Sequence, residues 1–139
     1  MRKAITIPAV AMLVVLVACG GGTPKASNSP TQSGGRPTST GHLTIVSPTP
    51  NEVIHGTTLH VKVTLTGARI VPRGTLTITP DTGHIHISID GQIKSLYAGT
   101  EYDQPGLTKG RHLLQVEFVA ADHGFFNPRV IVTQTFIVE

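Results

Sequence analysis

The sequence predicts an all-β domain, an antiparallel β-sandwich of about seven short strands, preceded by an apolar leader and a polar linker. Residues from His42 onward form short runs in which apolar and polar side chains alternate, which is typical of strands with one buried face. Glycine, proline, asparagine and aspartate separate these runs at regular spacing. Beyond the leader, no stretch has the 3.6-residue periodicity of a helix.

The leader, residues 1–18, has the features of a signal peptide. Two basic residues precede an apolar run, Ala4 to Val17, that is too short for a membrane span of about 20 residues. The run ends in Leu16-Val17-Ala18-Cys19-Gly20, which resembles the lipobox of bacterial lipoproteins. That resemblance implies that Cys19 carries a lipid, such as palmitate, and anchors an extracytoplasmic protein to the cell membrane or outer membrane. The alternative is an ordinary signal peptide with an incidental cysteine.

Residues 19–41 are expected to form a flexible tether between the lipid and the domain. This segment is rich in Gly, Ser, Thr and Pro, and it contains too few apolar residues to offset its ordering entropy by burial. The domain itself is expected to span residues 42–139. Cys19 is the only cysteine in the chain, so no disulfide is available to the domain.

Charge distribution argues against a nucleic-acid partner. The whole chain carries a formal net charge of +3. From His42 onward, however, seven lysines and arginines face eight aspartates and glutamates, so the positive excess belongs to the leader and linker. The domain therefore lacks the basic stripe that a phosphate backbone requires.

One run, Gly83 to Gly91, is expected to be a central strand of the sheet. Its isoleucines alternate with His84, His86, Ser88 and Asp90, and its final Asp-Gly pair predicts a hairpin turn. The segment 75–79 lies between two prolines and is expected to be an edge strand or part of a long loop. The remaining strands are expected at residues 43–46, 59–65, 92–97, 100–108, 110–119 and 129–138.

About seven strands in about 98 residues favour an immunoglobulin-like sandwich, although the disulfide and core tryptophan of antibody domains are absent. The segment Leu107–Leu114 has the pattern L-x-x-G-x-H-x-L and resembles the entry to the penultimate strand of bacterial immunoglobulin-like domains. Together with Gly83–His86 and Ala121–Gly124, it resembles small immunoglobulin-like lipoproteins of the cell envelope. The resemblance implies a fold and not a reaction.

All seven histidines lie in the domain. The expected strand order predicts at which end and on which face of the sandwich each one lies. His84 and His86 are expected to point outward from one strand, close enough to share a metal ion. Antiparallel pairing is expected to bring Glu117 beside them, and the turn that contains His123 is expected to lie at the same end, together with His42. The candidate copper or zinc site is therefore His84 and His86 with Glu117 or His123. The alternative is that both strand histidines are solvated surface residues.

His112 is expected to face inward, to cap the core and to bond a nearby backbone group. His55 and His60 are expected at the surface. Phe125 and Phe126 are adjacent in a chain poor in aromatic residues, and their rings could have either of two roles. Either one ring closes the end of the core, or both rings are exposed and bind a partner.

Known catalytic patterns are absent from the sequence. There is no glycine-rich phosphate loop, no nucleophile elbow and no expected pair of carboxylates at glycosidase spacing. We therefore expect no enzyme, but a lipid-anchored, non-catalytic binding or structural module of the cell envelope. Its expected partner is an envelope protein, or a copper or zinc ion bound at His84 and His86.

Overall fold

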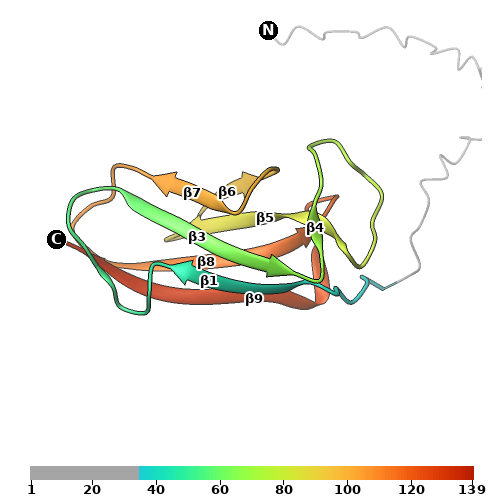
Figure 1. Cartoon of the computed structure of the whole chain (residues 1–139), viewed down its shortest axis with the longest axis horizontal. Coiled ribbons are helices and arrows are strands. Elements are labelled where there is room, and N and C mark those ends of the chain that lie inside the picture. Colours follow the sequence, from blue (N-terminus) through green and yellow to red (C-terminus); the bar gives the residue numbers. More distant parts are fainter. Residues whose placement is uncertain (1–34) are drawn as a thin grey trace, which may run out of the picture. The chain divides into compact units, whose positions relative to one another are not determined.

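A computed structural model describes residues 35–139, which fold into nine β-strands (Figure 1). Within this range no helix is long and apolar enough to cross a membrane. Residues 1–34, with the predicted signal peptide and Cys19, lie outside the described residues. The strands are β1 (His42–Ser47), β2 (Val53–Ile54), β3 (Leu59–Thr66), β4 (Arg69–Ile70), β5 (Thr82–Ile89), β6 (Gln92–Leu96), β7 (Glu101–Gln104), β8 (Gly110–Ala120) and β9 (Phe125–Val138).

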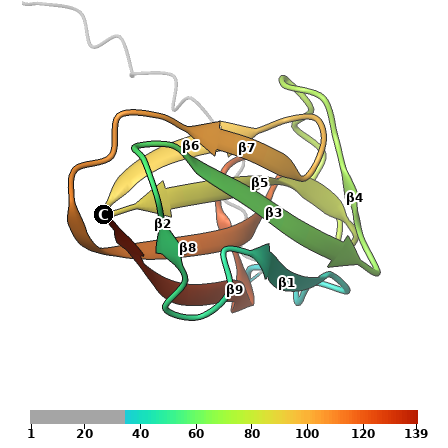
Figure 2. The ribbon, with the colours of Figure 1, turned by 60° about the vertical axis from the view of Figure 1, so that its left-hand side comes forward.

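The strands form two sheets that face each other (Figure 2). One sheet has the order β1-β3-β7, and the other has the order β2-β9-β8-β5-β4, with β6 also pairing with β5. All pairings are antiparallel except the two-residue pairings of β2 with β9 and of β4 with β5. The predicted all-β immunoglobulin-like sandwich is therefore confirmed.

The core lies between the two sheets and is built by the alternation seen in the sequence. In β3, Leu59, Val61 and Val63 are buried while the residues between them are exposed. Burying such apolar surface stabilises the fold by about 25 cal/mol per Å². The larger sheet contributes the isoleucines of β5 and three phenylalanines, at positions 118, 126 and 136, each of which is fully buried.

The turn between β5 and β6 forms as the sequence predicts. Asp90 and Gly91 have φ values of 49° and 85°, so both adopt the left-handed conformation that a two-residue hairpin turn of type I′ requires. Residues 71–81 form a long loop, which resolves the alternatives for the proline-bracketed segment 75–79.

Two expectations about the strands differ from the structure. The last strand begins at Phe125 rather than at about Arg129, because the hydrogen-bonded register with β8 extends across a bulge at Phe118 and Val119. The second concerns β5, whose outward face was expected to be exposed. His84 is only 1% exposed and Ser88 is also buried.

Residues 36–41, expected to belong to the tether, hydrogen bond to the sandwich. The Asn127 N–H donates to the Pro37 carbonyl at 3.0 Å, and the Thr40 N–H donates to the Pro80 carbonyl at 2.9 Å. The domain thus includes residues 36–41, ahead of His42, its expected first residue.

Candidate metal centre

The candidate site begins with two histidines on β5. His84 and His86 are two residues apart, so the strand geometry places their side chains on the same face. His84 is buried and His86 is half-buried, because β5 has the neighbours β8 and β6 on its two sides and a turn lies over it. Gly83 lets β8 come this close, since a Cβ at that position would overlap the carbonyl of Val119.

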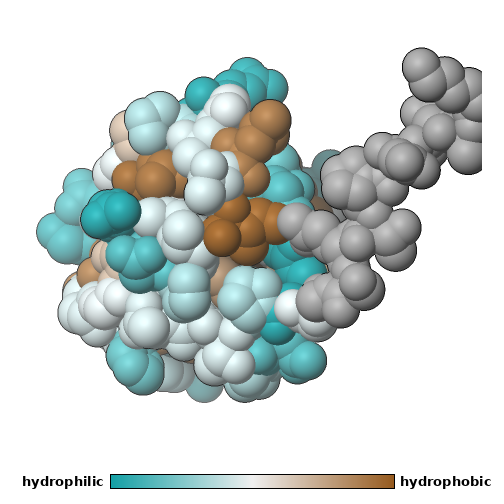
Figure 3. Space-filling view, turned by 90° about the vertical axis from the view of Figure 1, so that its right-hand side faces the viewer, coloured by the Kyte–Doolittle hydropathy of each residue, from teal (hydrophilic) through white to brown (hydrophobic). Residues whose placement is uncertain are grey.

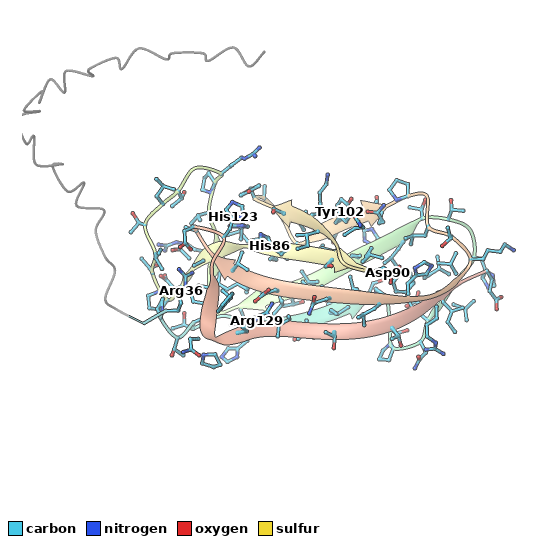
Figure 4. The ribbon with its side chains drawn as sticks, turned by 180° about the vertical axis from the view of Figure 1, so that it is seen from behind. Arg36, His86, Asp90, Tyr102, His123 and Arg129 are labelled. Atoms are coloured by element: carbon cyan, nitrogen blue, oxygen red, sulfur yellow. The ribbon has the colours of Figure 1, made fainter. Side chains whose placement is uncertain are left out.

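The third histidine, His123, belongs to the turn between β8 and β9. Its φ of 66° places it in the left-handed region, and the His123 N–H donates to the Ala120 carbonyl at 3.0 Å. A second bond, from the Ala120 N–H to the Gly124 carbonyl at 2.9 Å, closes the turn. The turn thus carries the exposed His123 to the β5 histidines, and Figure 4 shows His123 beside His86 at one end of the sandwich.

Three imidazole nitrogens converge at this point. His84 Nε2 lies 3.1 Å from His86 Nε2 and 3.1 Å from His123 Nδ1, and the last two nitrogens lie 3.3 Å apart. A tetrahedral zinc ion with Zn–N bonds of about 2.0–2.1 Å would hold its nitrogens about 3.3 Å apart. Three mutually adjacent nitrogens cannot satisfy one another by linear hydrogen bonds, whereas a single cation can accept all three lone pairs.

Tyr97, which follows β6, orients His123. The Tyr97 hydroxyl lies 3.1 Å from Nε2 of His123, the ring nitrogen on the side away from the cluster. If Nδ1 is the metal ligand, Nε2 carries the proton and donates it to the Tyr97 oxygen, which is the usual way a protein fixes the tautomer of a ligand histidine. The Tyr97 ring also packs on His84, with centroids 4.8 Å apart. Tyr97 was not predicted from the sequence, because its role depends on how the turn that carries His123 folds over β5.

The environment keeps the strand histidines neutral. Burial, together with the neighbouring His123 and His86, lowers the pKa of His84 from 6.5 to about 4. Burial and His123 also lower the pKa of His86, and Glu117 only partly opposes them. Neutral imidazole is the form that binds metal. The cluster therefore favours a metal ion over protons at neutral pH.

Glu117 does not join the histidines, so its expected role as a ligand is not supported by the structure. It pairs with His86 across the sheet as predicted, but its carboxylate is bound by the Arg129 guanidinium through two hydrogen bonds of 2.7 Å. The two groups form a bidentate ion pair, which is the geometry that guanidinium and carboxylate prefer. This partner was not predictable from the sequence, because Arg129 comes from the neighbouring strand β9.

The other four histidines lie apart from the site. His42, His55 and His60 are exposed. The convergent group contains only His84, His86 and His123 among the described residues, so His42 does not join the cluster as expected. His112 faces inward as predicted and is 6% exposed. Its Nδ1 lies 2.6 Å from Asp90 Oδ2 and its Nε2 lies 2.8 Å from the Thr108 carbonyl, so a backbone partner is present as expected.

The two adjacent phenylalanines have different environments. Phe126 is fully buried and stacks on Phe118, which confirms that one ring closes the core and excludes Phe126 as a partner-binding residue. Phe125 is 55% exposed and lies beneath the Arg129 guanidinium. A partner-binding role for Phe125 stays a prediction. Figure 3 shows the end of the sandwich that lies on the right in Figure 1. Hydrophobic residues reach the surface there, among more hydrophilic ones.

Comparison with known proteins supports the fold. No protein-family model matches the chain, and no curated protein does. Among solved structures, the chain is similar to the fibronectin(III)-like modules of Clostridium thermocellum CbhA, with a TM-score of 0.50, 18% identity and coverage of 70% of this chain and 96% of that one. It also matches part of an engineered protein, with a TM-score of 0.47, 12% identity and coverage of 71% and 20%. The first similarity shows an immunoglobulin-like sandwich and no specific function.

Proposed function

We propose that this protein binds one copper or zinc ion through His84, His86 and His123, as a non-catalytic module held at a membrane by a lipid on Cys19. The observation that supports metal binding is the convergence of three imidazole nitrogens within 3.1–3.3 Å of one another. They are the one group of three or more histidine, cysteine or acidic residues within residues 35–139 that has metal-binding geometry.

The donor set selects the class of metal. Imidazole nitrogen suits zinc and copper, whereas magnesium and calcium prefer oxygen ligands. Residues 42–139 contain neither cysteine nor methionine, so no soft sulfur donor is available from the domain. For a set of nitrogen donors, copper(II) binds more tightly than zinc. Three protein ligands also leave a fourth position for water or for a donor from another molecule.

The module is proposed to handle metal and not to catalyse a reaction. The fold is shared with fibronectin(III)-like modules, and the carboxylate of Glu117, which pairs with His86 across the sheet, is bound by Arg129. Glu117 is thus not free to act as a general base. A lipid on Cys19 would place the metal site outside the cytoplasm, where it could collect or pass on copper or zinc.

The direct test is a titration of the full chain with copper(II) and zinc(II). A Cys19→Ser background removes the only thiol, so that it cannot compete for metal. We expect one equivalent of metal, and for copper an electron paramagnetic resonance spectrum with coupling to three nitrogens. His123→Ala should weaken binding by about a hundredfold or more, above the 10–100-fold cost of removing an orienting group.

His60→Ala is the matched control, because His60 is exposed and lies on β3 in the other sheet. Its affinity should equal that of the parent. His123 is also exposed, so the loss in His123→Ala would not come from an unfolded core. Binding that survives both His86→Ala and His123→Ala would overturn the proposed function.

A further inference from the structure

The segment before β1 also contacts the turn that carries His123. We call residues 36–40 the strap. The Arg36 side chain donates from Nη1 and Nη2 to the two oxygens of Asp122, at 2.7 and 2.9 Å, and from Nε to the Phe125 carbonyl at 2.8 Å. Asp122 and Phe125 flank His123 and Gly124. One guanidinium therefore spans the turn that positions the third metal ligand. Figure 4 shows Arg36 and His123 at the same end of the sandwich.

The backbone of the strap is fixed as well. The Pro37 carbonyl accepts from the Asn127 N–H at 3.0 Å, and the Thr38 hydroxyl donates to the Asn127 carbonyl at 2.8 Å. Further along, the Thr40 N–H donates to the Pro80 carbonyl, close to the start of β5. The strap thus contacts the segments that lead to both parts of the metal site.

Asp122 connects the strap to the turn. Its Oδ1 accepts from Nη2 of Arg36 and also from the Gly124 N–H, at 3.1 Å. Gly124 is also the residue against which the guanidinium lies, since a Cβ there would overlap it.

His123 needs this support. It is an exposed residue in the left-handed conformation, which few residues other than glycine adopt, although histidine is among those that adopt it more often. Its Nδ1 must nevertheless lie within a few tenths of an ångström of a fixed point to complete a metal site. The turn's own backbone bonds close it, and the strap adds a charged, bidentate contact on the far side of the same residues.

We propose that the strap and the metal centre are coupled, with Arg36 as a positioning residue for His123. This inference rests on the proposed function. If docking of the strap favours metal binding, then by linkage metal binding favours docking of the strap by the same factor. The strap connects the domain to residues 19–35, which lead to the proposed anchor. Release of the strap would therefore lower the affinity of the three-histidine site for metal.

The first test compares Arg36 variants in the full chain with Cys19→Ser. Arg36→Ala should lower copper(II) affinity about tenfold, within the range known for groups that orient ligands, and should change the nitrogen coupling in the resonance spectrum. Arg36→Lys should lie between the two, because an ammonium keeps the charge but not the bidentate geometry. Gly124→Ala should reproduce the loss without altering Arg36, by displacing the guanidinium.

Arg111→Ala is the matched control. Arg111 is an exposed arginine near the opposite end of β8, where it bonds Asn51. Arg111→Ala removes one positive charge, as Arg36→Ala does, and should leave the copper affinity and the resonance spectrum unchanged. Melting temperatures of the metal-free variants show whether a substitution destabilises the domain in general. The nitrogen coupling is the second readout, because a merely structural role would not alter it.

The second test measures the coupling in the reverse direction. Hydrogen exchange at the Asn127 N–H, which donates to Pro37, should slow about tenfold when zinc(II) binds the parent protein, and the slowing should disappear in Arg36→Ala. Unchanged affinity and unchanged exchange would overturn the coupling and leave the proposed function intact. Failure of the parent to bind either metal through the three histidines would overturn both.

Discussion

At the scale of single residues, His84 shows how environment decides chemistry. Its place in an alternating strand predicts an outward side chain, and its nitrogen does meet His86 and His123 on that face. The structure nevertheless leaves it 1% exposed. Burial and the neighbouring His123 and His86 lower its pKa to about 4, so the ring stays unprotonated where a solvated histidine would be partly charged. Alternation alone predicts the direction of a side chain but not what covers it.

A second pair of residues, Asp90 and His112, predicts how stability depends on pH. The Asp90 bond raises the pKa of His112 above 6.5, although burial opposes it. Burial favours a higher pKa for Asp90, but the bonds from the Leu113 N–H and His112 outweigh it, so that pKa is lowered. Both groups therefore stabilise the folded state when charged.

His112 contributes fully to the free energy of unfolding below about pH 6.5, and this contribution is lost as the pH rises through its raised folded-state pKa. The contribution of Asp90 is present above about pH 4 and is lost as the pH falls through its lowered pKa. Part of the free energy of unfolding at pH 5.5 should thus be absent at pH 8.5. In Asp90→Asn this part should vanish at both pH values.

Chemical denaturation of the parent and of Asp90→Asn at these two pH values measures the difference. Asparagine also tolerates the left-handed conformation of the Asp-Gly turn, so the variant preserves the hairpin. A pH dependence that is identical in both proteins would show that the pair contributes nothing. His112 was recognised from sequence as a core-facing residue, whereas Asp90 was recognised only as a turn residue.

At the scale of elements, the start of β9 contains a core residue, Phe126, next to a surface residue, Phe125. Phe126→Ala should destabilise the domain by about 3–5 kcal/mol, because it leaves a cavity beside Phe118. Phe125→Ala should cost less than about 1 kcal/mol, since it removes an exposed ring and a contact with the Arg129 guanidinium. Thermal or urea unfolding of the two variants gives the comparison, and equal losses would contradict the assigned burial.

The elements themselves were largely predictable. Alternation located β3, β5 and β8, and the Asp-Gly pair located the β5–β6 hairpin, because these signals are local in sequence. The start of β9 was not predicted. The strand continues through Asn127-Pro128 to Phe125 because β8 offers partners in register, and proline-containing sequence gives no sign of that.

At the scale of the whole molecule, the predicted anchor can be tested separately from the metal site. We expect the full chain, made in a bacterium with a lipoprotein pathway, to incorporate radiolabelled palmitate and to sediment with membranes. Cys19→Ser should abolish labelling and move the protein to the soluble extracytoplasmic fraction. Labelling that persists in Cys19→Ser would contradict the lipobox interpretation, and His60→Ala, which leaves the leader intact, should behave as the parent.

The sequence by itself determined the fold class and the candidacy of His84, His86 and His123, because strand period and turn chemistry are written in neighbouring residues. The pairing of β5 with β8 followed from the strand order of an immunoglobulin-like sandwich, once that fold was predicted. Only the tertiary structure decided that Glu117 belongs to Arg129, that Tyr97 supports His123, and that Arg36 holds the turn. These contacts join residues from different strands or from the chain before β1, and their geometry exists only once the two sheets have packed. Side-chain partners across such distances leave no periodic signal in the chain.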